Sequence, residues 1–309
     1  MRLFPRLLTV EFLKLRNSAA LRMAWLLPLL FLLLDFWVFE RPALSVHTLS
    51  ADYAITLNTM QIKLLGSLWA GFFHPLMVAL LPALILRPEH RFKQWKHLHA
   101  QPVPRRGVFL AKAVVLLALM AGSLSLIGMG FSLERSLLAR INPLLAFPLH
   151  GAELARILGW LWLGSLPLLT LYLWVADRID SLAVPIVFGL LGIMLTISLS
   201  ASDLSGLENP KPWKRDLIPW VLSYFCAQRA IQDVHARQDV HIAGKVFKEE
   251  PNIIKLPSGR RVRTYQPVPE DVLFPPPPPT PVWILAVFSV SAGVVLLGLG
   301  LADAGRNRN

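Results

Sequence analysis

The sequence has few charged residues and almost no cysteine. Only 16% of its 309 residues are charged, and cysteine occurs once, at Cys226. A single cysteine excludes an intrachain disulfide. So low a charged fraction, beside 54% hydrophobic residues, is wrong for a soluble globular domain. The composition therefore indicates an integral membrane protein.

Several catalytic and nucleotide-binding motifs are also missing. The sequence contains no G-x-x-x-x-G-K-[ST], no H-E-x-x-H, no C-x-x-C and no G-x-S-x-G. Without the first of these, the chain cannot cradle nucleotide phosphates in the P-loop manner, so any use of ATP requires another chain to bind it. None of the motifs that would indicate an enzyme is present.

Six apolar stretches are long enough to cross the hydrocarbon core of a bilayer as helices, which takes about 20 residues. Because a spanning helix satisfies its own backbone hydrogen bonds, the sequence predicts an all-α integral membrane protein with six transmembrane helices and no separate soluble catalytic domain. After the third stretch, the amphipathic sequence SLERSLLARI predicts a helix lying in the outer interface. The six stretches lie near 23–39, 64–86, 113–131, 157–175, 182–199 and 282–302.

Positive charge is distributed unevenly along the chain, whose 31 Lys and Arg residues outnumber its 19 Asp and Glu residues. In a soluble protein this excess would suggest nucleic acid, but here its position matters more than its sum, and no nucleic-acid partner is expected. Basic residues gather before the first span, in the 87–112 connection and at the C-terminus. The positive-inside rule places both termini and that connection in the cytosol, an N-in/C-in topology.

The chain divides into three parts on this topology. Residues 1–199 hold an N-terminal amphipathic helix and transmembrane helices 1–5, residues 200–281 form an extracytoplasmic segment, and residues 282–309 hold transmembrane helix 6 and a cytoplasmic tail. The outward-facing segment is expected to contain an interfacial helix, a short β-hairpin and a polyproline spacer. Its aromatic residues suit the outer interface: Trp213, Trp220, Tyr224 and Phe225.

Two ionisable side chains fall inside predicted spans, where such groups are costly and are functional candidates. Asp35 lies in the outer part of the first span, and His74 lies within the second. The structural alternatives are an Asp35 close to the headgroups and a His74 bonded across helices. The cytosolic histidines His90, His97 and His99 lack paired cysteines or suitably spaced carboxylates, and no metal site is predicted.

Three further stretches form a pattern along the chain. In VEFLKLRNSAALRMAWLLPLL, Glu11, Lys14 and Ser18 precede an apolar span. RPEHRFKQWKHLHAQPVPRRGVFLAK combines an acidic residue, a short amphipathic helix, a Pro-x-x-Arg element and Lys112 before span three, and LIPWVLSYF places a Pro-Trp pair between spans five and six. This order resembles the permease subunits of ABC-2 type transporters, especially the bacitracin and lantibiotic export and immunity branch. Residues 240–281 look like an insertion.

The resemblance implies the membrane subunit of an ATP-driven exporter in the bacterial cytoplasmic (inner) membrane. In such permeases a short cytosolic helix between spans two and three docks on a separate ABC ATPase subunit, which binds ATP and Mg. This chain would hold no cofactor, would not be an enzyme, and would pair with a second permease copy or a homologous permease. An amphiphilic or apolar cargo, such as an antimicrobial peptide or lipid-like molecule, is implied. The residues expected to couple to the ATPase within 87–107 are Glu89, Arg91, Lys93, Trp95, Leu98, Arg105 and Arg106, with Trp95 and Leu98 as apolar anchors.

Other interpretations stay open beside this one. The basic 87–112 connection would also serve as a lipid-facing loop that binds anionic headgroups of membrane lipids. The chain would alternatively be a membrane scaffold or regulator that binds a partner through its outer segment. A third interpretation is a membrane-embedded lipid-modifying enzyme that uses His74 or the cytosolic histidines.

Overall fold

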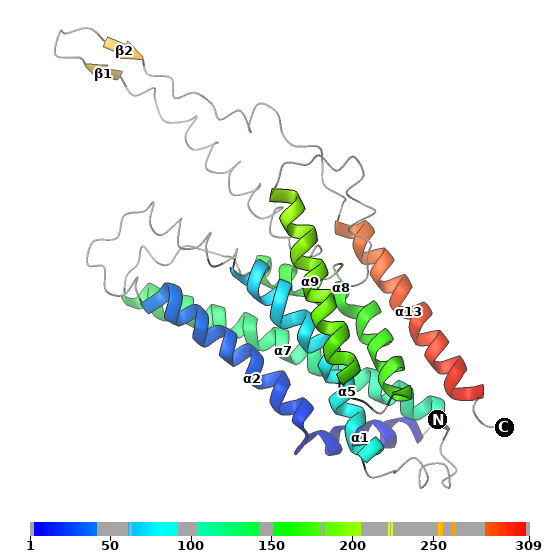
Figure 1. Ribbon diagram of the computed structural model, residues 1–309. Helices are drawn as coiled ribbons and strands as arrows, with labels where there is room; N and C mark the ends of the chain where they lie inside the picture. The colour runs from blue at the N-terminus through cyan, green and yellow to red at the C-terminus, as the bar shows by residue number, and fades with distance from the viewer. Residues whose placement is uncertain are drawn as a thin grey trace.

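The computed structural model of the chain is a bundle of long helices (Figure 1). It describes residues 3–41, 61, 64–91, 104–141, 151–179, 181, 183–204, 222, 224, 253–255, 261–263 and 282–306. The helices in these ranges are α1 (Leu3–Leu15), α2 (Ala19–Asp35), α5 (His74–Arg91), α7 (Arg105–Ile141), α8 (Gly151–Arg178), α9 (Ala183–Leu204) and α13 (Val282–Arg306). Two π-helical segments, η1 (Phe36–Glu40) and η2 (Leu65–Phe73), adjoin α2 and α5. The predicted helical membrane architecture is confirmed.

Five helical stretches are long and apolar enough to cross a membrane. They correspond to the first four predicted spans and the sixth. The predicted fifth span coincides with α9, whose apolar part, Ala183–Ser198, is shorter than the other five. The five are Ala19–Val38, Leu65–Glu89, Arg105–Arg140, Gly151–Arg178 and Val287–Ala304.

Two short strands lie in the segment between α9 and α13. Strand β1 (Ile253–Lys255) pairs antiparallel with β2 (Arg261–Arg263), and Ile254 lies opposite Val262. Each strand has three residues, so this pair contributes little to the stability of the fold by itself. The interfacial helix and the polyproline spacer predicted for the rest of this segment lie outside the described residues, apart from two helical positions at 222 and 224.

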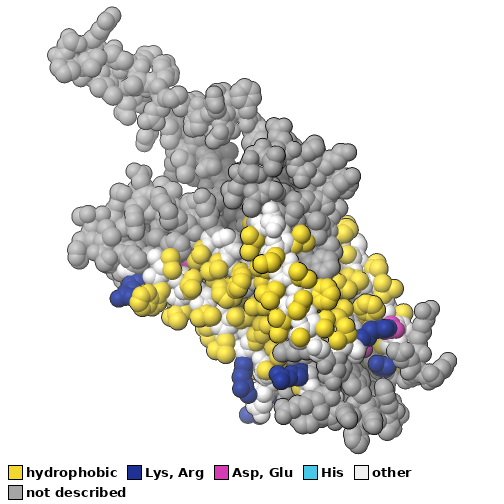
Figure 2. Space-filling view, in the orientation of Figure 1, with side chains coloured by type: hydrophobic (Ala, Val, Ile, Leu, Met, Phe, Trp, Pro, Cys, Tyr) yellow, Lys and Arg dark blue, Asp and Glu magenta, His cyan; other side chains and the backbone are white. Residues whose placement is uncertain are grey.

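Apolar side chains cover much of the visible outer face of the described helices (Figure 2). Leu26 of α2, Met194 of α9 and Val294 of α13 are each more than 60% exposed. A soluble protein rarely exposes apolar surface on this scale, whereas a protein surrounded by lipid must do so. The outer faces of these helices are therefore the lipid-facing surface.

The core of the bundle is built around α5 and α8. Helix α5 packs against α2, α7, α8 and α9, while α8 also contacts α7 and α13. Large side chains that are fully buried at these contacts include Phe31, Trp69, Met77, Leu116 and Leu161. Phe31 and Trp69 meet with their ring centroids 5.3 Å apart, which joins α2 to η2. Packing between apolar faces thus fixes the relative positions of the spans.

Helix α7 is longer than the sequence predicted. It runs without interruption through 37 residues, and SLERSLLARI forms its last turns and not a separate interfacial helix. The helix continues past the predicted end of the third span near residue 131 because neither proline nor glycine interrupts the chain between Phe131 and Ile141. At about 1.5 Å per residue the helix is about 55 Å long, well beyond a hydrocarbon core of about 30 Å.

Both ends of the described chain pack against the first turns of α7. Gly107 lies next to Leu7 of α1, since a Cβ at Gly107 would be 3.3 Å from the Leu7 side chain. At Gly300 of α13, a Cβ would be 2.7 Å from the ring of Phe109. Helix α1 and the end of α13 therefore lie at the same end of the bundle as the start of α7 (Figure 1).

Candidate functional site

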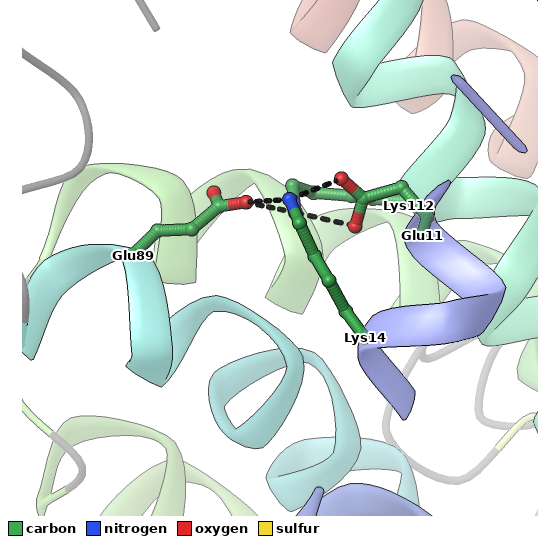
Figure 3. A network of polar contacts seen from close by, with 4 residues as sticks. All are labelled: Glu11, Lys14, Glu89 and Lys112. Carbon is green, nitrogen blue, oxygen red and sulfur yellow. Dashed lines mark hydrogen bonds and ion pairs between the residues drawn. The ribbon is translucent and has the colours of Figure 1, made fainter. Parts of the chain in front are cut away.

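Four charged side chains from three helices form a continuous cluster at that end of the bundle (Figure 3). The Lys112 Nζ donates hydrogen bonds to Glu89 Oε1 at 2.6 Å and to Glu11 Oε2 at 2.9 Å. The Lys14 Nζ donates to Glu11 Oε1 at 2.8 Å and to Glu89 Oε1 at 3.2 Å. Each lysine therefore bridges both carboxylates. We call Glu11, Lys14, Glu89 and Lys112 the ion cluster.

The ion cluster is largely removed from solvent. Lys112 and Glu89 are each 2% exposed and Glu11 is 6% exposed, whereas the side chain of Lys14 is 40% exposed. Two positive and two negative charges cancel, which is the condition under which buried charges are tolerated. Removing one partner would leave an uncompensated buried charge, so the four residues stabilise the junction as a unit.

The position of each side chain on its helix explains why the four meet. Glu11 and Lys14 are three residues apart and so share one face of α1. Glu89 lies in the last turn of α5, and Lys112 lies two turns into α7, on the face that α1 covers. Gly107 permits the close approach of α1 to α7, because no side chain at 107 separates the two helices.

The pKa shifts of α1 agree with paired charges. Burial by itself would raise the pKa of Glu11, but the charge of Lys112 and hydrogen bonds from both lysines outweigh it, and the pKa is lowered from 4.5. Burial would lower the pKa of Lys14, but its contacts with Glu11 and Glu89 raise it above 10.5. Both groups are therefore charged at neutral pH.

A second set of ion pairs lies at the same end of the bundle. Arg105, the first residue of α7, pairs with Asp177 of α8 at 3.7 Å. Arg178 of α8 pairs with Asp303 of α13 and lies over the ring of Trp174, 5.0 Å from its centroid. The Trp174 Nε1 also donates to Asp303. Together with the ion cluster, these contacts link α1, α5, α7, α8 and α13.

The predicted coupling residues occupy different environments. Glu89 is buried in the ion cluster and bonded to Lys112, so it is not part of an exposed rim. Arg105 is partly buried against Asp177, and Arg106 is exposed. Arg91 ends α5, while Lys93, Trp95 and Leu98 lie outside the described residues.

The two predicted intramembrane polar residues are both fully buried. Asp35 accepts a hydrogen bond from the Gln61 Nε2 at 3.1 Å. His74 follows η2 directly, and its ring centroid lies 6.5 Å from that of Trp69. Neither ring nitrogen of His74 has a hydrogen-bond partner in the described structure. The hydrogen bond to another helix that the sequence offered as the structural alternative is therefore not found there.

Other parts of the sequence-based site stay predictions. Of the outer aromatic residues, Tyr224 is described, and it packs against the core beside Gly71. Trp213, Trp220 and Phe225 lie outside the described residues. Among the residues that the structure describes, no group of three His, Cys, Asp or Glu side chains is placed to hold a metal ion.

Sequence reasoning did not identify the ion cluster as a site. The sequence indicates only a family-like pattern for Glu11, Lys14 and Lys112 and a coupling role for Glu89. The available signal was that each acid or lysine lies on the flank of a long apolar run, where a charge is either solvated or paired. Their sequence separations of 75 and 101 residues give no local indication that they meet.

The comparisons with known proteins identify the family. The sequence model of the ABC-2 family transporter proteins matches residues 7–196, which is more than half of the chain, and the chain belongs to that family. The match covers most of α1, all of α2 to α8 and most of α9, and so includes all four residues of the ion cluster. No curated protein and no solved structure matches the chain.

Proposed function

We propose that this ABC-2 family chain is the membrane subunit of an ATP-driven exporter, coupled to a separate ATPase through residues 87–107. The observation that carries the proposal is the ion cluster. It joins the helix before the 92–103 connection, through Glu89, to the helix after it, through Lys112, and attaches α1 to both. A force applied to that connection by a partner would reach three helices at once.

Several further properties belong to the same proposal. The chain would have six spans, with α9 as the fifth, and both termini in the cytosol of a bacterial inner membrane. Two copies, or one copy with a homologous permease of the bacitracin and lantibiotic branch, would pair with two ATPase chains that bind ATP and Mg. The basic 87–107 segment would contact the ATPase through Trp95 and Leu98, with Arg91, Lys93 and Arg106 around them.

The mechanism follows from the stiffness of this junction. Nucleotide-driven closure of the ATPases would displace the 92–103 connection, and the buried ion cluster would carry the displacement into α1, α5 and α7 because separating its charges is costly. Arg105 and Arg178 would pass it to α8 and α13 through Asp177 and Asp303. The interface between the spans would then open alternately to each side of the membrane.

An amphiphilic or apolar cargo suits this bundle. Side chains buried between the described spans are mostly apolar, and the ion pairs gather at one end of the bundle. A polar solute would need a row of hydrogen-bonding groups along its path, whereas an antimicrobial peptide or lipid-like molecule can pass along apolar helix faces. The outer aromatic residues Trp213, Trp220, Tyr224 and Phe225 would cover the exit.

The decisive experiment is co-purification of the tagged full chain in detergent. The expected result is stoichiometric recovery of an ATPase with Walker motifs, lost in a Trp95→Asp, Leu98→Asp double variant. A His97→Ala, His99→Ala double variant changes the same segment without the apolar anchors and should keep the ATPase. Size-exclusion profiles establish that each variant is folded.

Other outcomes would replace the proposal. A folded wild-type chain that recovers no ATPase would favour a scaffold that binds through its outer segment. Loss of cellular function in the histidine variant with the ATPase still bound would favour the lipid-modifying enzyme.

A further inference from the structure

An open groove runs between α7 and α8 in the half of the bundle far from the ion cluster. Its volume is about 700 Å³, within the range of sites that hold small molecules. Small residues make the space on both walls, with Ser125, Gly128 and Ser132 on α7 and Gly151 and Gly159 on α8. A Cβ at Gly151 or Gly159 would meet nothing within 4 Å, so the described residues leave the groove open at these two positions.

The groove lies at the depth of one leaflet. Its innermost residue on α7, Ala121, is about 24 Å along the helix from Arg105, and the groove extends from there to Ser136. With a hydrocarbon core of about 30 Å, this range covers one half of the bilayer and its interface. On the proposed topology, that half is the outer leaflet.

The walls are suited to hydrocarbon and not to water or ions. Leu124, Leu154 and Leu158 supply apolar surface. The hydroxyl groups of Ser132 and Ser136 donate to the carbonyl oxygens of Gly128 and Leu133 in their own helix, at 2.7 and 2.8 Å. With these donors satisfied within α7, the two serines contribute small size and not a row of free hydrogen-bond donors.

The charges at the outer end of the groove favour an anionic headgroup. Arg140 follows Ser136 by one helical turn and continues the groove face of α7, and Arg156 adjoins Ala155 on α8. Both arginines are exposed, whereas Glu134, Arg135 and Glu153 at the same end are partly buried. An exposed guanidinium at the membrane interface is a good partner for a lipid phosphate.

We propose that this groove binds an acyl chain of an anionic phospholipid, with the phosphate at Arg140. The lipid is a resident component of the membrane domain and not the exported cargo. It completes the packing between α7 and α8, which the described residues leave open at Gly151 and Gly159. The site therefore gives the α7–α8 contact a dependence on lipid composition that the ion cluster at the other end does not share.

Photolabelling of the full chain tests the site. The probe is phosphatidylglycerol with a diazirine in the middle of one acyl chain, in vesicles of phosphatidylethanolamine and phosphatidylglycerol. Labelled peptides should come predominantly from residues 121–136 and 151–162. Gly159→Leu places a side chain in the groove, where it would compete with the acyl chain for space. The expected loss of lipid affinity reduces this labelling by about tenfold. Gly298→Leu, at another open glycine on α13 and away from the groove, should leave labelling unchanged.

The headgroup is tested in the same assay. Arg140→Gln should reduce labelling by the phosphatidylglycerol probe relative to a phosphatidylcholine probe, whereas Arg106→Gln at the opposite end should not. Labelling spread evenly over α2, α9 and α13, or unaffected by Gly159→Leu, would overturn the proposal. Disulfide formation between two copies through Met129→Cys, in a Cys226→Ser chain, would assign the groove to a second copy. All these readouts are independent of ATPase recovery.

Discussion

Lys112 and Glu89, two residues that are each 2% exposed, form a 2.6 Å ion pair between the last turn of α5 and the second turn of α7. The pair holds α5 and α7 together close to the 92–103 connection between them. Because Lys112 also binds Glu11, the contact attaches the N-terminal helix to the same point. The first turns of α7 are thus a junction of three helices.

Replacing Lys112 should destabilise the protein far more than replacing Lys14. Lys112→Met keeps the length of the side chain but leaves Glu89 and Glu11 short of a buried partner, with an expected loss of about 3 to 5 kcal/mol. Lys14→Met removes a half-exposed partner, and a loss of about 1 kcal/mol or less is expected. Thermal unfolding of both variants in detergent measures the difference.

A compensated variant controls for lost packing. Glu11→Gln, Glu89→Gln and Lys112→Met together remove the three buried charges and leave side chains of similar volume, while the charge of Lys14 stays partly solvated. Much of the stability should therefore return. If the triple variant is as unstable as Lys112→Met alone, packing and not charge compensation holds the junction.

The loss of folding stability at acidic pH should depend on Glu11. Its pKa is lowered in the folded protein, so its contribution is complete above the ordinary value of 4.5 and is lost as pH falls through the lowered value. The raised pKa of Lys14 has the opposite effect, since its contribution is complete below 10.5 and is lost above that pH. The stability difference between wild type and Glu11→Gln should therefore be constant around neutral pH and shrink below about pH 4.5. Melting temperatures of both proteins across this range measure it, and a difference that grows on acidification would contradict the assignment.

Hydropathy predicted the spans because length and apolar composition are local properties. The positions of α2, α5, α8 and α13 follow from runs of about 20 apolar residues. The length of α7 was missed because its last turns carry Glu134, Arg135 and Arg140, which made them look like a separate surface helix. The ion cluster was missed for a different reason. Whether Glu89 is solvated or paired depends on where α1 packs, and that contact joins parts of the chain 75 residues apart.

Two glycines of α13 should respond in opposite ways to alanine. At Gly300, a Cβ would lie 2.7 Å from the ring of Phe109, so Gly300→Ala should separate α13 from α7 at a cost of about 1 to 3 kcal/mol. At Gly298, a Cβ would meet nothing within 4 Å, and Gly298→Ala should stabilise the helix by up to about 1 kcal/mol. Thermal unfolding compares the two, and equal effects would show that Phe109 moves aside without cost.

His74 should be replaceable with a gain in stability. Its imidazole is fully buried, and neither ring nitrogen has a hydrogen-bond partner in the described structure, which leaves the penalty of burying a polar group uncompensated. His74→Leu fills much of the same space without polar atoms and should raise the melting temperature, by an amount that corresponds to about 1 kcal/mol or more. Thr170→Val is the matched control, because the buried Thr170 hydroxyl donates to helix carbonyls and its removal should lower stability slightly.

A lower melting temperature for His74→Leu would show that the imidazole has a polar partner after all. Higher stability together with lost ATPase stimulation would mean that His74 is retained for transport at the expense of packing.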